Sequence, residues 1–214
     1  MSISDRTAVV AGGMVLLLSM GGCGVETGED RGATASTKVE QVMRSGQGRF
    51  DLTSPPSRDE VGLAAGSSHV AYEQPDQRPF EVRVALPEGA GLAFDARLVW
   101  FDSLGSPDPA TGPPTTLDIH HYTTLAGARD HLLAAAEQFG FAPEAIDRWY
   151  AEASGPRPVA APSTVRTPWL TATVGYLELQ VRGGYSPPVD TPDSDQTVVH
   201  YALRWGADPA SPPP

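Results

Sequence analysis

The chain has 214 residues, a hydrophobic content of 40% and a formal net charge of −11 at pH 7. This length and composition predict one globular domain with additional segments. The acidity excludes nucleic-acid binding as a main activity, because that activity needs clustered lysine and arginine. The single cysteine, Cys23, excludes a disulfide within the chain.

The N-terminal stretch has the three parts of an export signal. A short polar segment contains one basic residue, Arg6, and an apolar segment covers residues 8–18. Small residues, Gly21 and Gly22, then precede Cys23. Small residues are needed there because a peptidase must approach the backbone closely. We therefore predict a signal peptide over residues 1–22.

The run Met20-Gly21-Gly22-Cys23 resembles the lipobox of bacterial lipoproteins, in which leucine and two small residues precede cysteine. The resemblance implies cleavage between Gly22 and Cys23 and attachment of diacylglyceryl to the Cys23 sulfur. Fatty chains such as palmitate would then anchor the protein in the cell membrane, on its extracytoplasmic side. Stable anchoring requires more than one acyl chain.

Two other interpretations of this stretch remain open. Residues 7–25 carry no charge and are about long enough for an uncleaved transmembrane helix, which needs roughly 20 apolar residues. Five glycines in that stretch weaken such a helix. Alternatively, the protein is an ordinary secreted one whose lone cysteine has no role.

Composition divides the remaining chain into three parts. Residues 23–48 contain few large apolar side chains, which predicts a flexible tether, with a possible helical turn over residues 38–44. An ectodomain is expected over residues 49–206. Residues 207–214 are proline-rich and are expected to be disordered.

Periodicity predicts the elements of the ectodomain. A capping box at Ser57 and Glu60 indicates a short helix. Alternating apolar residues predict strands over residues 69–72, 80–86, 92–101, 115–122 and 197–205. Residues 169–181 read as one long strand with a bulge at Gly175-Tyr176, because the apolar parity changes there.

Two helices are predicted between the third strand and this long one. One covers residues 124–139, with Gly140 as its stop, and the other follows Pro143 and ends near Gly155. The order of elements predicts an α+β fold, an antiparallel sheet of about five strands with two helices packed on one face.

Candidate chemistry is sparse. Asp118 and His120 share one face of a predicted strand, and His121 points to the other. A hydrolytic or metal site would use such residue types, but we favour the interpretation of a solvated polar strand face. His131 is expected on the exterior of its helix.

The acidic run Asp190, Asp193 and Asp195 has the alternation of a calcium loop but lacks the required glycine and glutamate. A solvated acidic turn is therefore expected. The sequence contains neither a Gly-x-Ser-x-Gly elbow nor a phosphate loop.

We therefore expect a membrane-anchored, non-catalytic binding or interaction module of the cell envelope, with no cofactor and no metal. Its partner would be an envelope protein or a cell-wall component. One alternative is a carrier that holds an apolar ligand in a cavity between sheet and helices. The other is an envelope hydrolase that uses Asp118 and His120.

Overall fold

The structure is a computed structural model, and it describes residues 37–156, 164–186 and 197–206. The predicted signal peptide, Cys23, the acidic run at residues 190–195 and the C-terminal tail lie outside these residues. The described chain forms helices α1 (Thr37–Ser45), α2 (Leu125–Phe139) and α3 (Glu144–Ser154) and a short 3-10 turn, η1 (Pro87–Gly89). Its strands are β1 (Gln47–Asp51), β2 (His69–Glu73), β3 (Phe80–Ala85), β4 (Gly91–Ala96), β5 (Leu98–Asp102), β6 (Thr116–Thr123), β7 (Val165–Arg166), β8 (Leu170–Val174), β9 (Leu177–Tyr185) and β10 (Thr197–Arg204).

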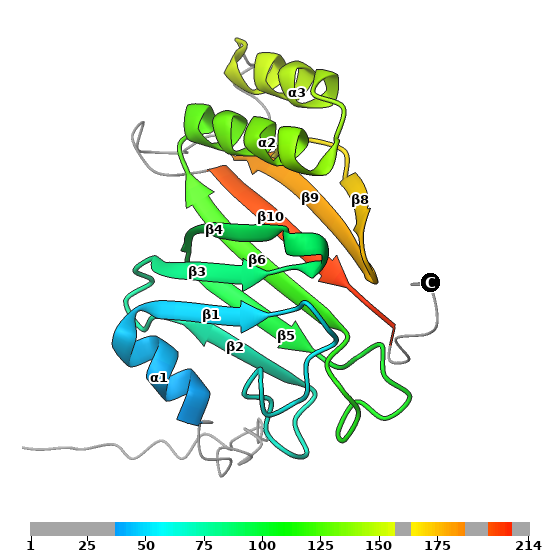
Figure 1. Ribbon diagram of the computed structural model, residues 1–214. Helices are drawn as coiled ribbons and strands as arrows, with labels where there is room; N and C mark the ends of the chain where they lie inside the picture. Colours follow the sequence, from blue (N-terminus) through cyan, green and yellow to red (C-terminus); the bar gives the residue numbers. More distant parts are fainter. Residues whose placement is uncertain (1–36, 157–163, 187–196, 207–214) are drawn as a thin grey trace, which may run out of the picture. The chain divides into compact units, whose positions relative to one another are not determined.

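The strands form two sheets (Figure 1). Seven strands form an antiparallel sheet in the order β2-β5-β6-β10-β9-β7, with β8 also paired to β9. The smaller sheet has the order β1-β3-β4, and its β1 and β3 are parallel. The predicted α+β class with an antiparallel sheet is confirmed. The predicted numbers of strands and helices were too low.

The smaller sheet and α2 pack on one face of the larger sheet, which we call the inner face. The Phe50 ring of β1 lies 5.2 Å from that of Tyr72 in β2 and 5.1 Å from that of Phe101 in β5, measured between centroids. Phe94 of β4 stacks on Tyr201 of β10 at 5.0 Å. These aromatic contacts join the two sheets into one core.

Helices α2 and α3 follow the sequence prediction closely. The Thr124 side chain accepts a hydrogen bond from the Gly127 amide at the start of α2, and Gly140 ends the helix with a φ of 75°. Ala128, Leu132, Ala135 and Ala136 are the buried stripe of this helix. Apolar residues three and four apart thus turn one side of α2 toward the sheet.

The segment predicted as one strand over residues 92–101 is two strands in two sheets. β4 pairs with β3 in the smaller sheet, and β5 pairs with β2 and β6 in the larger one. The chain changes sheets at Arg97, whose amide donates to the His120 carbonyl. The buried side chains occupy even positions before Arg97 and odd positions after it, because the chain presents its other side to the core once it has crossed. Leu98 and Trp100 continue the apolar alternation of the sequence, which is why one strand was predicted.

The bulge predicted at Gly175-Tyr176 is instead a hairpin turn. Val174 pairs directly with Leu177, so β8 and β9 are antiparallel neighbours joined by two residues. Gly175 has a φ of 58°, which suits the first position of a type II′ turn. A two-residue reversal explains the parity change without an inserted residue.

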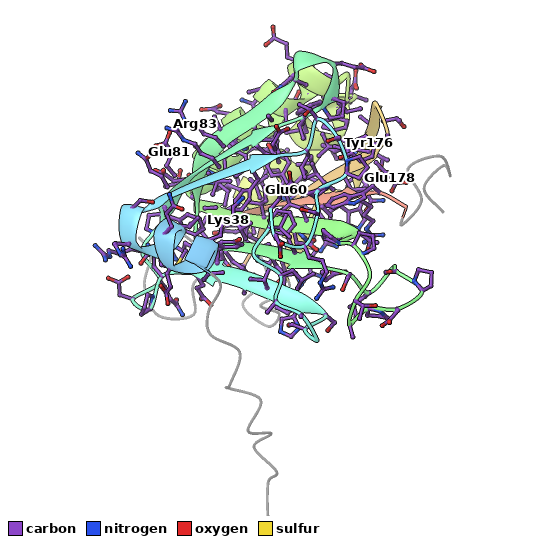
Figure 2. The ribbon with its side chains drawn as sticks, turned by 60° about the horizontal axis from the view of Figure 1, so that its bottom comes forward. Lys38, Glu60, Glu81, Arg83, Tyr176 and Glu178 are labelled. Carbon is purple, nitrogen blue, oxygen red and sulfur yellow. The ribbon has the colours of Figure 1, made fainter. Side chains whose placement is uncertain are left out.

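The last part of the predicted tether has regular structure: residues 37–45 form α1, which includes the helical turn expected over residues 38–44, and β1 begins at Gln47. Val42 of α1 is 4% exposed and belongs to the core. The Lys38 ammonium donates to the Glu60 carbonyl, and Figure 2 shows Lys38 on α1 near Glu60 on the following loop. The helix is also indicated by apolar residues at helical spacing, namely Val39, Val42 and Met43. The polar composition of the segment as a whole does not show this pattern.

The predicted capping box forms its contacts without a helix. Glu60 accepts hydrogen bonds from the Ser57 amide at 2.7 Å and from its hydroxyl at 2.8 Å. The chain then makes a turn, and Gly62 has a φ of 68°. Left-handed glycine geometry ends the turn before a helix can continue.

Candidate functional site

The candidate site is the outer face of the seven-stranded sheet, opposite the smaller sheet and α2. The described helices lie elsewhere: α1 lies against β1 and β2 with Val42 in the core, α2 lies against β6, β9 and β10 on the inner side, and α3 lies against α2 and β7. Most side chains that alternate outward are polar, charged or aromatic, and they include Trp100, Asp118, His120, Tyr122, Arg182 and His200.

Strand pairing brings a histidine pair together at the centre of the outer face. His200 of β10 stands directly opposite His120 of β6, and the ring centroids are 4.6 Å apart. His200 Nε2 lies 2.6 Å from Asp118 Oδ1. The predicted neighbours Asp118 and His120 do share this face, but the hydrogen-bonded partner of Asp118 is His200.

Sequence reasoning missed His200 because strand register is set by tertiary pairing. The alternation over residues 197–205 already placed His200 on the polar side of its strand. It did not reveal that β10 lies between β6 and β9.

The Asp118–His200 pair can orient an imidazole. The Asp118 carboxylate accepts a hydrogen bond from His200 Nε2, and this contact fixes the orientation of the ring. Burial, together with His200, lowers the pKa of His120, while Asp118 opposes the shift. Among the described residues, no serine or threonine hydroxyl is hydrogen-bonded to either histidine, and no group of three metal-ligating side chains forms.

A groove of about 200 Å³ opens beside the histidine pair, and we call it the outer-face groove. Its lining comes from β6, β7, β9 and β10 and the residues next to them: His120, Tyr122, Thr164, Arg166, Arg182, Gly184, Ser186, Val198 and His200. The Arg182 guanidinium lies over the Trp169 ring, 4.2 Å from its centroid. Trp169 also meets the His200 ring edge-on at 5.2 Å.

A second outer-face cavity, of about 310 Å³, has the opposite charge. Its lining includes the carboxylates Asp102, Asp118 and Glu178 and the guanidinium of Arg204. Burial, with Asp118 nearby, raises the pKa of Asp102. The outer face is therefore divided into a cationic groove and an acidic cavity.

The other two histidines of interest lie on the inner face. His121 stacks on His131 with centroids 4.7 Å apart, and His131 Nε2 lies 2.8 Å from the Tyr201 hydroxyl. Burial lowers the pKa of His131 to about 4, with a smaller contribution from His121. The expectation that His131 lies on the helix exterior was wrong, because α2 turns this residue toward β10.

A cleft of about 820 Å³ lies between α1, β1 and the loop that follows β1. It is lined by Lys38, Gln41, Val42, Ser45, Gln47, Arg49, Asp59, Gly62, Leu63 and Ala64. Burial lowers the pKa of Lys38, and Glu60 opposes the shift. The lining is a mixture of polar and apolar groups, and the cleft lies away from the space between α2 and the sheet, where the carrier hypothesis places its apolar cavity.

Comparison with protein-family models, with curated proteins and with solved structures found no match. None of the helices within the described residues is long and apolar enough to span a membrane.

Proposed function

We propose that this chain is a lipid-anchored binding protein of the bacterial cell envelope that holds its partner on the outer face of the seven-stranded sheet. The anchor is the acylated Cys23 expected from the lipobox. The partner is an envelope protein or a cell-wall component. No step of the proposal requires catalysis.

The composition of the outer face is the observation that carries this proposal. Antiparallel sheets commonly have one solvated face, so exposure alone indicates nothing. Here the exposed face combines Trp100, Trp169 and Tyr122 with arginines and a histidine pair, and Tyr122 is 37% exposed. Aromatic residues and arginine are enriched at protein interfaces relative to other surfaces.

The interior supports this choice over the apolar carrier. The space between the sheets is filled by ring contacts such as Phe50 with Phe101 and Phe94 with Tyr201. Leu132 of α2 is fully buried against the inner face. A ligand cavity would require these side chains to separate.

Site-specific photo-crosslinking in intact cells tests the proposed face. A photoreactive phenylalanine analogue at Tyr122 places the reactive group on the outer face. The same analogue at Arg83 places it on the exposed side of the smaller sheet, where Arg83 Nε donates to Glu81 at 2.6 Å (Figure 2). We expect specific adducts from position 122 and none from position 83. Adducts from position 83 alone would contradict the proposal.

A further inference from the structure

We propose that the outer-face groove is a binding site for a phosphate group, so that the ligand of this face is a phosphorylated molecule. This inference rests on the proposed function and names the chemistry of its ligand. The charged lining residues of the groove are all basic in type, whereas the α1 cleft and the second outer-face cavity both include carboxylates.

Adjacent strands arrange the basic side chains in a row. His120, His200 and Arg182 stand directly opposite one another on β6, β10 and β9. Directly opposed side chains have Cβ atoms about 5 Å apart. Arg166 of β7 is opposite Gly184, two residues further along β9, so its side chain faces the same groove.

The two arginines of this row lack a counter-charge among the residues that the structure describes. Neither Arg166 nor Arg182 forms an ion pair with a described carboxylate. Asp118 is within reach of the row, but its carboxylate is held by His200. Burial and the nearby Arg166 lower the pKa of Arg182, and a bound anion would offset the repulsion between these two guanidinium groups. Such a cationic groove is a local exception on a chain of net charge −11.

The donors also have the geometry that phosphate requires. Trp169 supports one face of the Arg182 guanidinium, which fixes its plane and leaves its N–H edge available. The hydroxyls of Thr164 and Ser186, 2.9 Å apart, stand at the rim. Side-chain donors from β6, β7 and β9, together with the two flanking hydroxyls, line the groove. A tetrahedral dianion with three or more oxygens can accept from all of them, whereas a planar carboxylate cannot.

Gly184 provides space at the floor of the groove. A Cβ atom there would meet only ordinary contacts, with Val198 Cγ1 at 3.5 Å and Arg166 Cγ at 3.8 Å. A larger side chain would therefore occupy the groove without forcing the backbone to move. Gly184→Val blocks the space while leaving every charge in place.

Titration calorimetry of the full-length protein in non-ionic detergent with inorganic phosphate at pH 7 tests the proposal. We expect saturable binding of one phosphate per chain, weaker binding of acetate by about tenfold or more, and a loss of about tenfold in phosphate affinity for Arg182→Gln. Gly184→Val is expected to abolish binding. Arg204→Gln is the matched control, because Arg204 is on the same face but in the acidic cavity, and it should change the affinity by less than about twofold.

Three results would overturn the inference. They are the absence of phosphate binding by a folded protein, acetate binding as tight as phosphate binding, and equal weakening by Arg182→Gln and Arg204→Gln. Thermal unfolding of each variant verifies that it is folded. The proposed function is tested separately, because adducts at position 122 without phosphate binding would leave the binding face in place and reject only the ligand class.

Discussion

Gly183 and Gly184 are neighbours on β9, yet their Cα hydrogens face opposite sides of the larger sheet. A Cβ atom on Gly183 would lie 2.8 Å from Leu132 Cδ1 and 3.2 Å from the Trp149 ring. Gly183 therefore permits α2 and α3 to approach the inner face closely. Gly184 instead leaves the outer-face groove open. Two adjacent glycines therefore have different roles: Gly183 is needed for packing of the core, and Gly184 is needed for the open space of the outer-face groove.

Alanine substitution should separate these two roles. We expect Gly183→Ala to lower the free energy of unfolding by about 1–3 kcal/mol, because the added methyl overpacks the core. Gly184→Ala should change it by less than about 1 kcal/mol, since alanine suits a strand at least as well as glycine does. Denaturant unfolding of both variants measures the difference. Equal destabilisation would contradict the close approach at Gly183.

His131 makes the stability of the fold depend on pH. Its pKa is lowered from 6.5 to about 4 by burial and by His121, and its neutral Nε2 accepts from the Tyr201 hydroxyl. Burial raises the pKa of Tyr201, which keeps this hydroxyl protonated. Between pH 6.5 and about 4 the unfolded chain binds a proton that the folded chain does not. The contribution of His131 is thus complete above pH 6.5 and is lost as the pH falls toward 4.

The substitution His131→Gln should remove this dependence. Glutamine can still accept from Tyr201, but it does not titrate. We expect the wild-type protein to lose up to about 3 kcal/mol relative to the variant between neutral pH and pH 4. Parallel unfolding curves at several pH values measure the difference. Identical pH profiles for the two proteins would show that His131 does not carry the effect.

At the scale of elements, the apolar periodicity correctly predicted those helices and strands whose limits depend only on nearby residues. Four elements begin and end close to their predicted limits: β3, β6, α2 and α3. Their limits are set by apolar spacing and by capping residues such as Thr124 and Gly140, which influence only the few residues next to them. Segments that change sheet or reverse direction were misread. Residues 92–101 and 169–181 were each predicted as one strand. In the first segment the apolar alternation continues through the crossing at Arg97, and in the second the parity change marks a turn.

The position of β1 also required tertiary information. Its short alternation contains only one large apolar residue, Phe50, and the parallel pairing with β3 is not visible in the sequence. For the same reason the Asp118–His200 contact could not be read from the chain. Asp118 and His120 identified the correct face of β6, but only the register between β6 and β10 shows that His200 lies beside them.

Phe50 tests whether β1 belongs to the folded domain. It is 3% exposed and contacts the rings of Tyr72 and Phe101. We expect Phe50→Ala to cost about 3–5 kcal/mol of stability. Arg49→Ala is the matched control on the same strand, because Arg49 is exposed, and it should stay within about 0.5 kcal/mol of wild type. A Phe50 variant as stable as the control would mean that β1 is a loosely attached part of the tether.

At the scale of the whole molecule, we propose that one chain contains both a lipid anchor and an open binding face. The anchor depends on the Cys23 sulfur, which lies outside the described residues. We expect Cys23→Ser to move the protein from the membrane fraction to the soluble extracytoplasmic fraction and to abolish the mass of the acyl chains. Ser36→Ala, in the predicted tether, is the control and should remain membrane-bound. A Cys23→Ser protein that stays in the membrane with its mass unchanged would contradict the anchor.

The central claim is that the outer face of the seven-stranded sheet, at the outer-face groove, binds the ligand. Amide chemical-shift mapping of the full-length protein in detergent, titrated with inorganic phosphate, tests this claim most directly. The account predicts that the largest shifts cluster at Arg182, Gly184, Val198 and His200, which line the groove. Saturable shifts confined to the α1 cleft or to the smaller sheet, with these four amides unmoved, would contradict it.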